Sequence, residues 1–279
     1  MLRDISFESG VKGPKILILG AVHGNETAGP RACERLIKEI EKGNVNINKG
    51  RLILVPITNS KAYKDDVRQI EENLNRVIKK WENPISYEQK LGVEVAKKID
   101  ECDYVLDVHS THNAGDIPFS FLDYPTFGNM EIVKALDVEY VLSGWPEVYG
   151  TQNEIKDFST ETYAHAQGKN GITLECGYHK DNAATELAYN SIINLLKTLK
   201  MIEGEPSYKD KKIVRMTDII IKEKAGKLAE NFKHFDFIPK NAVIARYDDG
   251  EELRSVKDCY MIIPNPEAKI GAEWYYLGE

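Results

Sequence analysis

The stretch "KILILGAVHGNETAG" (residues 15–29) joins an apolar run to a glycine-rich loop that carries a histidine and a glutamate. The run at 15–20 is apolar almost throughout, which is typical of a strand covered on both faces of a parallel sheet. Similar runs lie at 51–58, 104–109 and 171–177, and amphipathic helical patterns lie at 30–43, 86–102 and 184–200. Strands that alternate with helices predict an α/β fold with a mostly parallel, mixed sheet flanked by helices.

The pattern changes near residue 204. Short β-like runs follow at 213–221, 241–247, 259–264 and 273–278, separated by turn-like stretches. We therefore expect two domains: an α/β domain over 1–203, which would hold the functional site, and a small β-rich C-terminal domain over 204–279. The segment 112–165 lacks a clear period, so we expect it to consist mostly of loops, and long loops at strand ends are often functional.

Composition restricts the partners of the protein. The 279 residues carry a net charge of −7, which argues against a nucleic-acid or anionic-membrane surface. The four cysteines are widely spaced and form no CxxC pair, which favours a reducing cytoplasm over a disulfide framework. The first ten residues lack the apolar core of a signal peptide, and no apolar run is long enough for a membrane helix.

Candidate metal ligands and a further carboxylate lie at the ends of three of the predicted strands. His23 and Glu26 come just after the first strand, His109 ends the third, and Glu175 lies near the end of the fourth. Because the carboxyl ends of parallel strands line the ligand crevice of an open α/β sheet, we expect these side chains to converge. Two histidines and one carboxylate with an open fourth position make a catalytic zinc site, and one carboxylate is then spare.

Each of these residues has a simpler interpretation when taken alone. A strand-end histidine is more often a hydrogen-bonded residue than a ligand, and Glu26 could be an acid placed in the first turn of a helix. Their joint position at strand ends of one sheet favours the metal site. Gly20, Gly24 and Gly29 are expected to let the backbone turn tightly there. Asp107 faces the same side of its strand as His109 and either supports the site or has a structural role.

Four short motifs resemble those of a known family. "HGNE" (23–26), "NLNR" (73–76), "DVHST" (107–111) and "LECG" (174–177) occur in the order found in the succinylglutamate desuccinylase/aspartoacylase family, a branch of the zinc carboxypeptidase superfamily. The resemblance implies a zinc-carboxypeptidase-like fold. It also implies that Zn²⁺ is the cofactor and that its ligands are His23, Glu26 and His109.

The resemblance also implies roles for other residues. Glu175 matches the catalytic glutamate, and Arg68 matches the arginine that polarises the scissile carbonyl. Asn75 and Arg76 match the pair that grips the carboxylate of the substrate. Aspartoacylases also use a tyrosine of the C-terminal domain, and the best local match places Lys269 or Ile270 there, with Tyr275 and Tyr276 nearby. The residue that reaches the pocket is therefore left open, and so are the acyl group and the amino acid.

The expected function is that of a zinc-dependent amidohydrolase that uses zinc-activated water to remove an acyl group from an N-acyl amino acid. One alternative is a zinc carboxypeptidase that acts on short peptides or cell-wall fragments. The other is a non-catalytic metal or metabolite binder, against which the presence of Glu175 speaks, since a binder needs no general base. The expected partner is a small molecule, with no nucleic acid and no membrane; the oligomeric state is left open.

Overall fold

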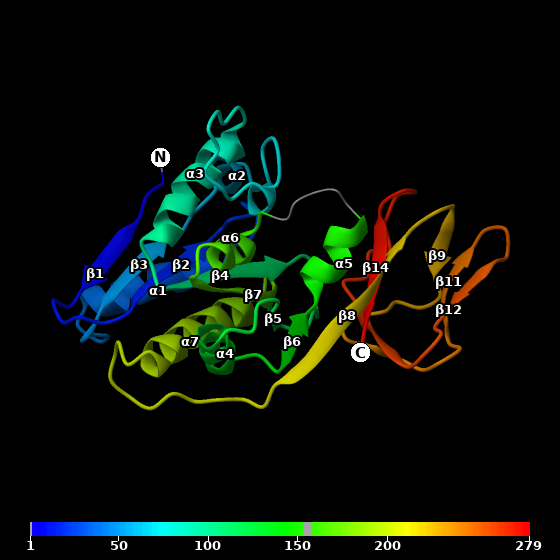
Figure 1. Ribbon diagram of the computed structural model, residues 1–279. Coiled ribbons are helices and arrows are strands. Elements are labelled where there is room, and N and C mark those ends of the chain that lie inside the picture. The colour runs from blue at the N-terminus through cyan, green and yellow to red at the C-terminus, as the bar shows by residue number, and fades with distance from the viewer. Residues whose placement is uncertain (1, 153–157) are drawn as a thin grey trace. The chain divides into compact units, whose positions relative to one another are not determined.

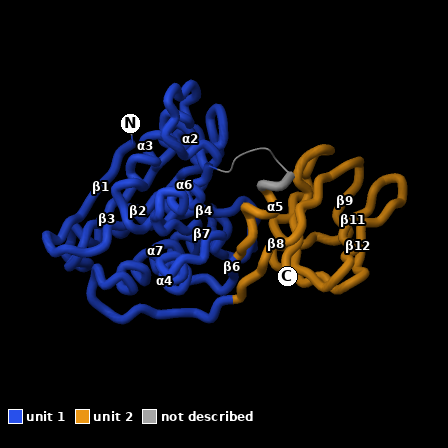
Figure 2. Tube along the Cα trace, viewed as in Figure 1, with its two compact units in different colours: residues 1–141, 156–211 blue, residues 142–155, 212–279 orange. Residues whose placement is uncertain are grey.

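The computed structural model describes residues 2–152 and 158–279. The chain divides into two compact units, one formed by 1–141 with 156–211 and the other by 142–155 with 212–279 (Figure 2). We call these the first unit and the second unit. The domain limits expected from the sequence differ from this division at 142–155 and at 204–211, and as functional domains they stay a prediction.

The first unit holds the helices and strands of the α/β part of the chain (Figure 1). Its elements are β1 (Ile5–Glu8), β2 (Lys15–Gly20), α1 (Ala28–Glu41), β3 (Arg51–Val55), α2 (Ser60–Lys64), the short 3₁₀ helix η1 (Leu74–Arg76), α3 (Tyr87–Asp100), β4 (Tyr104–Thr111), β5 (Phe119–Phe121), α4 (Phe127–Ala135), α6 (Thr160–Ala166), β7 (Asn170–Tyr178) and α7 (Asn182–Thr198). β6 (Tyr140–Ser143) includes the point at which the chain passes into the second unit.

The strands of the first unit follow the order β1-β3-β2-β4-β7-β5. The pairs β2/β3, β2/β4 and β4/β7 are parallel, whereas β1 and β5 pair antiparallel with their neighbours at the two sides. The predicted α/β fold with a mostly parallel, mixed sheet is therefore confirmed.

Alternate residues of the central strands pack against different helices. Ile16 and Ile18 of β2 belong to a core that contains residues of α1, α4 and α7, whereas Leu17 and Leu19 belong to a second core with residues of α3 and α6. Successive side chains of a strand point to opposite faces, so one apolar run supplies both layers. Burying each such aliphatic side chain contributes about 1.5–3 kcal/mol.

The segment 112–165 is not mostly loop, so that expectation is wrong. Within its described part the structure has β5, α4, β6, α6 and α5 (Trp145–Gln152). These elements are three to nine residues long, and so short a stretch repeats a period too few times to give a pattern. Their formation depends on partners distant in sequence: β5 pairs with β7, and Ile132 of α4 packs in the same core as α7.

The second unit is rich in β-structure, as predicted. Its strands are β8 (Lys212–Ile221), β9 (Gly226–Leu228), β10 (Phe237–Ile238), β11 (Val243–Tyr247), β12 (Glu252–Arg254), β13 (Cys259–Ile262) and β14 (Glu273–Gly278). Within this unit they run in the orders β8-β14-β13-β10 and β12-β11-β9, and all the pairs are antiparallel. Trp274 and Tyr275 are fully buried in the core of the unit. Across the described residues, we find no helix with the length and apolar character that a membrane crossing requires.

Candidate metal centre and active site

The loop after β2 brings His23 and Glu26 to the carboxyl end of the strand. It leaves the strand through Ala21, whose φ of 46° lies in the left-handed region that glycine normally occupies. Gly24 has no positive φ; a Cβ there would lie 2.1 Å from the carbonyl carbon of Ala62. The expected tight turn is present, because the N–H of Glu26 donates to the carbonyl of His23 at 3.2 Å across Gly24, but a positive φ is not what requires the glycine. Gly24 is needed because the loop lies directly on the backbone of α2.

His23, Glu26 and His109 form a single buried cluster. Nδ1 of His23 lies 2.8 Å from Oε1 of Glu26, and Nδ1 of His109 lies 2.8 Å from Oε2 of the same carboxylate. The two Nδ1 atoms are 3.1 Å apart. The structure thus brings together the three residues that the sequence proposed as ligands, and their geometry could hold a metal ion.

The outer nitrogen of each imidazole lies close to a side-chain oxygen. Nε2 of His23 lies 3.0 Å from Oδ1 of Asn73, and this oxygen also accepts the backbone N–H of Asn75 at 2.9 Å. The second bond identifies the Asn73 atom as oxygen, so Nε2 of His23 carries the proton and Nδ1 keeps a lone pair. Nε2 of His109 lies 2.9 Å from Oδ2 of Asp107, at an ion-pair distance but without the geometry of a hydrogen bond.

This arrangement fits a bound divalent cation. The Nδ1 atoms of both imidazoles and the carboxylate of Glu26 meet within about one hydrogen-bond length, and a positive charge among such electron-rich atoms relieves their repulsion. Two histidines and one carboxylate are also a donor set that zinc prefers. Sequence reasoning missed Asn73, although it opens the NLNR motif, and left the role of Asp107 open.

The electrostatics of the cluster point in the same direction. Burial lowers the pKa of His23 to about 4. Burial alone would raise the pKa of Glu26, but the two imidazoles outweigh it and lower that pKa well below its ordinary value. Burial would likewise lower the pKa of His109, yet the carboxylates of Asp107 and Glu26 raise it. The position between these groups therefore stabilises a cation, whether a proton or a metal ion.

Glu175 lies beside the cluster and outside it. It is level with His109 in the parallel pairing of β4 with β7, and its Oε2 is buried with no hydrogen-bond partner among the described residues. Burial, helped by the negative charge of Glu26, raises its pKa to about 8. A carboxyl group with a pKa near neutrality can both take up and release a proton, as a general base and acid must.

Arg68 reaches the cluster from the loop that follows α2. Its NH1 donates to Oε1 of Glu26 at 3.2 Å, while 42% of its side chain remains exposed. Its backbone carbonyl accepts the N–H of Gly24 at 3.1 Å, which joins the two loops. The guanidinium therefore lies at the open side of the cluster, where a bound molecule could meet it.

Asn75 and Arg76 lie on η1, the 3₁₀ helix of the NLNR motif. Oδ1 of the buried Asn75 accepts the backbone N–H of Thr160 at 2.9 Å, and Arg76 donates through NH1 to the carbonyl of Asn75 at 2.7 Å. The hydroxyl of Thr160 donates to Oδ2 of Asp107 at 2.7 Å. Thr160, which sequence reasoning also missed, therefore connects the NLNR motif to the carboxylate behind His109.

The C-terminal candidates all belong to the second unit. Tyr275 and Tyr276 are buried in β14, and the hydroxyl of Tyr276 donates to Glu273 at 2.5 Å. Lys269 and Ile270 are exposed. Which of them serves the substrate stays an open prediction.

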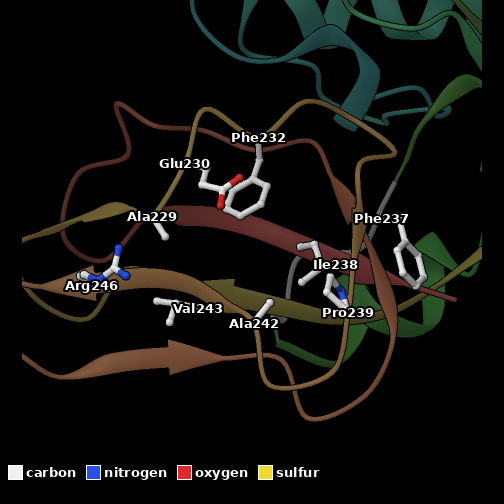
Figure 3. Close-up of a pocket in the computed structure, with 9 residues that line it drawn as sticks. All are labelled: Ala229, Glu230, Phe232, Phe237, Ile238, Pro239, Ala242, Val243 and Arg246. Carbon is white, nitrogen blue, oxygen red and sulfur yellow. The ribbon is translucent and has the colours of Figure 1, made fainter.

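A hollow of about 450 Å³ in the second unit is a separate feature (Figure 3). Most of the residues that line it are apolar, among them Phe232, Phe237 and Ile238, and its two charged residues, Glu230 and Arg246, are exposed. Arg246 also pairs with Glu252 at 3.1 Å. None of the site residues proposed from the sequence lines it, so it is not the candidate active site.

Comparison with known proteins identifies the family. The profile of the succinylglutamate desuccinylase/aspartoacylase catalytic domain matches residues 12–201. The chain belongs to this family. Its members hydrolyse the amide bond of N-acyl amino acids, so the expectation of an enzyme that acts on a linear amide bond is confirmed, and the non-catalytic binder is set aside.

Relatives match along almost the whole chain. The succinylglutamate desuccinylase of Shewanella sp. (strain MR-4) is 25% identical over an alignment of 289 positions, which spans 93% of this chain and 80% of the relative. The product-bound ectoine utilization protein EutE (DoeB) of Ruegeria pomeroyi is similar in fold, with a TM-score of 0.79 and 22% identity over 99% of this chain and 88% of that one. A succinylglutamate desuccinylase/aspartoacylase structure from Rhodobacter sphaeroides has a TM-score of 0.80 with 16% identity, over 100% of this chain and 89% of that one.

Proposed function

We propose that the protein is a zinc-dependent deacylase of an N-acyl amino acid, with His23, Glu26 and His109 as the metal ligands. The observation that carries this proposal is the buried cluster in which the Nδ1 atoms of two imidazoles and one carboxylate converge. Family membership supports the reaction class.

Glu175 is the proposed general base and acid. When zinc is bound, it supplies a Lewis acid and lowers the pKa of a water molecule to about 7. Glu175 accepts the proton of the water whose oxygen forms the new bond to the acyl carbon. As the carbon–nitrogen bond breaks, the same carboxyl group delivers that proton to the leaving amine. The raised pKa of Glu175 suits both transfers.

Arg68 is the proposed donor to the acyl oxygen. Negative charge develops on this oxygen in the transition state, and the guanidinium lies at the open side of the cluster. Removing a donor of this kind typically lowers kcat by a factor of about 10²–10³.

Arg76 and Asn75 are proposed to bind the carboxylate of the amino acid. A guanidinium can donate two parallel hydrogen bonds to a carboxylate, which lysine cannot do. Because Oδ1 of Asn75 already accepts from Thr160, its Nδ2 is the atom left to donate to the substrate. Both η1 residues are held by contacts of their own, so this part of the site is formed before the substrate binds.

The acyl group is proposed to be a short carboxylic acyl such as succinyl or acetyl. The similarity to succinylglutamate desuccinylases favours a succinyl group on glutamate as the first substrate to test. The cytoplasmic location expected from the sequence stays a prediction.

The test is amine release from N-succinyl, N-acetyl and N-formyl amino acids and from dipeptides, measured before and after the metal is stripped with a chelator and Zn²⁺ is added back. We expect hydrolysis of an acyl amino acid that is lost on stripping and restored by zinc. Faster cleavage of dipeptides would favour the carboxypeptidase alternative. Unchanged activity after complete metal removal would contradict the zinc mechanism.

Substrate recognition has its own test, which compares a free acid with its carboxamide. A charge-assisted hydrogen bond contributes about 1.5–3 kcal/mol, so the wild type should prefer the free acid strongly. Arg76→Lys keeps the charge but cannot donate two parallel hydrogen bonds, so we expect KM for the acid to rise about 10-fold or more. A variant that discriminates as well as the wild type would place the carboxylate site elsewhere.

A further inference from the structure

Glu88 is a completely buried carboxylate that has no part in the site described so far. It lies in the first turn of α3, which begins after Ser86, and 0% of its surface is exposed. Glutamate is almost never fully buried unless its charge is compensated, because an isolated carboxylate in the interior is costly. The groups that compensate it therefore indicate what it does.

Four N–H donors converge on this carboxylate. Oε1 accepts the backbone N–H of Ile70 at 2.8 Å and Nδ2 of Asn59 at 3.2 Å. Oε2 accepts the backbone N–H groups of Glu71 and Glu72 at 3.2 and 3.4 Å. Three of the donors are successive residues of a segment without helix or strand, between α2 and η1. Glu88 thus supplies the hydrogen bonds that regular structure supplies elsewhere.

Both ends of the clamped segment touch the candidate metal centre. Arg68, two residues before Ile70, donates to Glu26, and its carbonyl accepts from Gly24. Asn73, directly after Glu72, accepts from Nε2 of His23. The segment 68–73 therefore carries a group to each side of the cluster, and Glu88 holds its middle.

The remaining donor, Asn59, extends this link to the loop that carries His23 and Glu26. While Nδ2 of Asn59 binds Glu88, the backbone N–H of Asn59 donates to the carbonyl of Ala21 at 2.9 Å. Ala21 is the left-handed residue from which the chain enters the His23 loop. One buried carboxylate thus ties together α3, the 68–73 segment and the loop after β2.

We propose that Glu88 is a positioning residue, which fixes segment 68–73 so that Arg68 meets the acyl oxygen and Asn73 orients His23. This inference rests on the proposed function. Asn75 has an independent anchor in the backbone of Thr160, so substrate binding depends less on Glu88 than turnover does. A misplacement of about 1 Å far from the chemistry can cost about 10²-fold in rate.

The first experiment uses Glu88→Gln, with Glu101→Gln, an exposed residue just past the end of the same helix, as the control. The amide keeps one acceptor and places an NH₂ group against two N–H donors. We expect faster amide hydrogen exchange at 70–72, zinc affinity lower by about 10- to 100-fold, and kcat lower by a similar factor with a smaller change in KM. Unchanged exchange at 70–72 would overturn the proposal.

A double-mutant cycle with Arg68→Ala separates positioning from a general loss of stability. Because Glu88 also acts through Asn73 and His23, kcat is compared at saturating Zn²⁺, where Glu88→Gln should cost clearly less further kcat once Arg68 is absent. Fully additive losses would overturn the proposal. Should Glu88→Gln not fold, Glu88→Asp, which keeps the charge and shortens the reach, is expected to show smaller losses in the same measurements, and wild-type values would overturn it. Failure of the wild type to hydrolyse any acyl amino acid would refute the proposed function alone, because exchange and zinc affinity still test Glu88.

Discussion

Asn73 determines which nitrogen of His23 faces the metal position. Its oxygen is identified as such by the backbone N–H of Asn75 and therefore accepts the proton of Nε2. Such outer partners keep a ligating imidazole in one tautomer and one orientation. Asn73 therefore belongs to the candidate metal centre, although it is not one of the proposed ligands.

Removal of this acceptor should weaken metal binding without removing a ligand. We expect Asn73→Ala to lower zinc affinity by about 10- to 100-fold, as measured by competition with a chromogenic chelator. The exposed Asn46→Ala serves as the control and should bind like the wild type. Equal affinity in Asn73→Ala would show that His23 needs no partner at Nε2.

Glu175 differs from Glu26 in what it touches. Glu26 bridges both histidines, whereas Glu175 lies on the adjacent strand with a buried oxygen that has no partner among the described residues. We expect Glu175→Gln to keep about one zinc per chain and the wild-type fold, and to lose about 10²–10⁴ in kcat. Metal analysis and steady-state kinetics test this together. Loss of zinc would make Glu175 a ligand, and a normal kcat would place the base elsewhere.

Among the elements, the loop between β2 and α1 is limited by its contact with α2. A Cβ at Gly24 would lie 2.1 Å from the carbonyl carbon of Ala62 and 2.3 Å from the nitrogen of Tyr63. Neither backbone atom can move alone, so any side chain at 24 displaces the whole loop. The loop carries two of the proposed ligands, so its position and metal binding are coupled.

Gly24→Ala should therefore reduce both stability and zinc content. Overpacking of this kind costs about 1–3 kcal/mol. Gly43→Ala is the matched control, because Gly43 has a φ of +76° and no atom within 4 Å of its missing Cβ. It should lose about 1–2 kcal/mol from backbone strain alone and keep its zinc. Thermal unfolding and metal analysis distinguish the two, and full zinc occupancy in Gly24→Ala would refute the coupling.

At the scale of the whole molecule, stability in acid depends on a histidine outside the site. His234 of the second unit is buried, and its Nδ1 accepts the backbone N–H of Ile263 at 3.0 Å. Burial lowers its pKa to about 3, so it stays neutral in the folded chain, whereas the unfolded chain takes up a proton below the ordinary value of 6.5. The unfolded state then binds more protons, so stability falls as the pH falls from 6.5 towards 3.

The pH dependence of unfolding tests this role of His234. Within that window the group costs about 1.4 kcal/mol per pH unit. His234→Gln keeps an acceptor for Ile263 and does not titrate, so its urea unfolding free energy should fall less between pH 7 and pH 4.5 than that of the wild type. The exposed His165→Gln should behave like the wild type. An equal fall in His234→Gln and the wild type would refute the prediction.

The long elements and the cluster at the strand ends could be predicted from the chain alone. The apolar runs of β2, β4 and β7 are long enough to show that both faces are covered, and α3 begins at the serine that predicted its start. Parallel strands then bring their carboxyl ends to one edge of the sheet, which is why His23, Glu26 and His109 could be grouped before any coordinates were known.

Only the tertiary structure decided which groups hold that cluster in place. Asn73, Thr160 and Glu88 act through hydrogen bonds to residues up to 85 positions away, as between Thr160 and Asn75, and no local pattern encodes a partner at such a distance. The short elements of 112–165 likewise form because β7 and α7 lie beside them. Periodicity and motifs depend on neighbours along the chain, whereas the orientation of a side chain depends on neighbours in space.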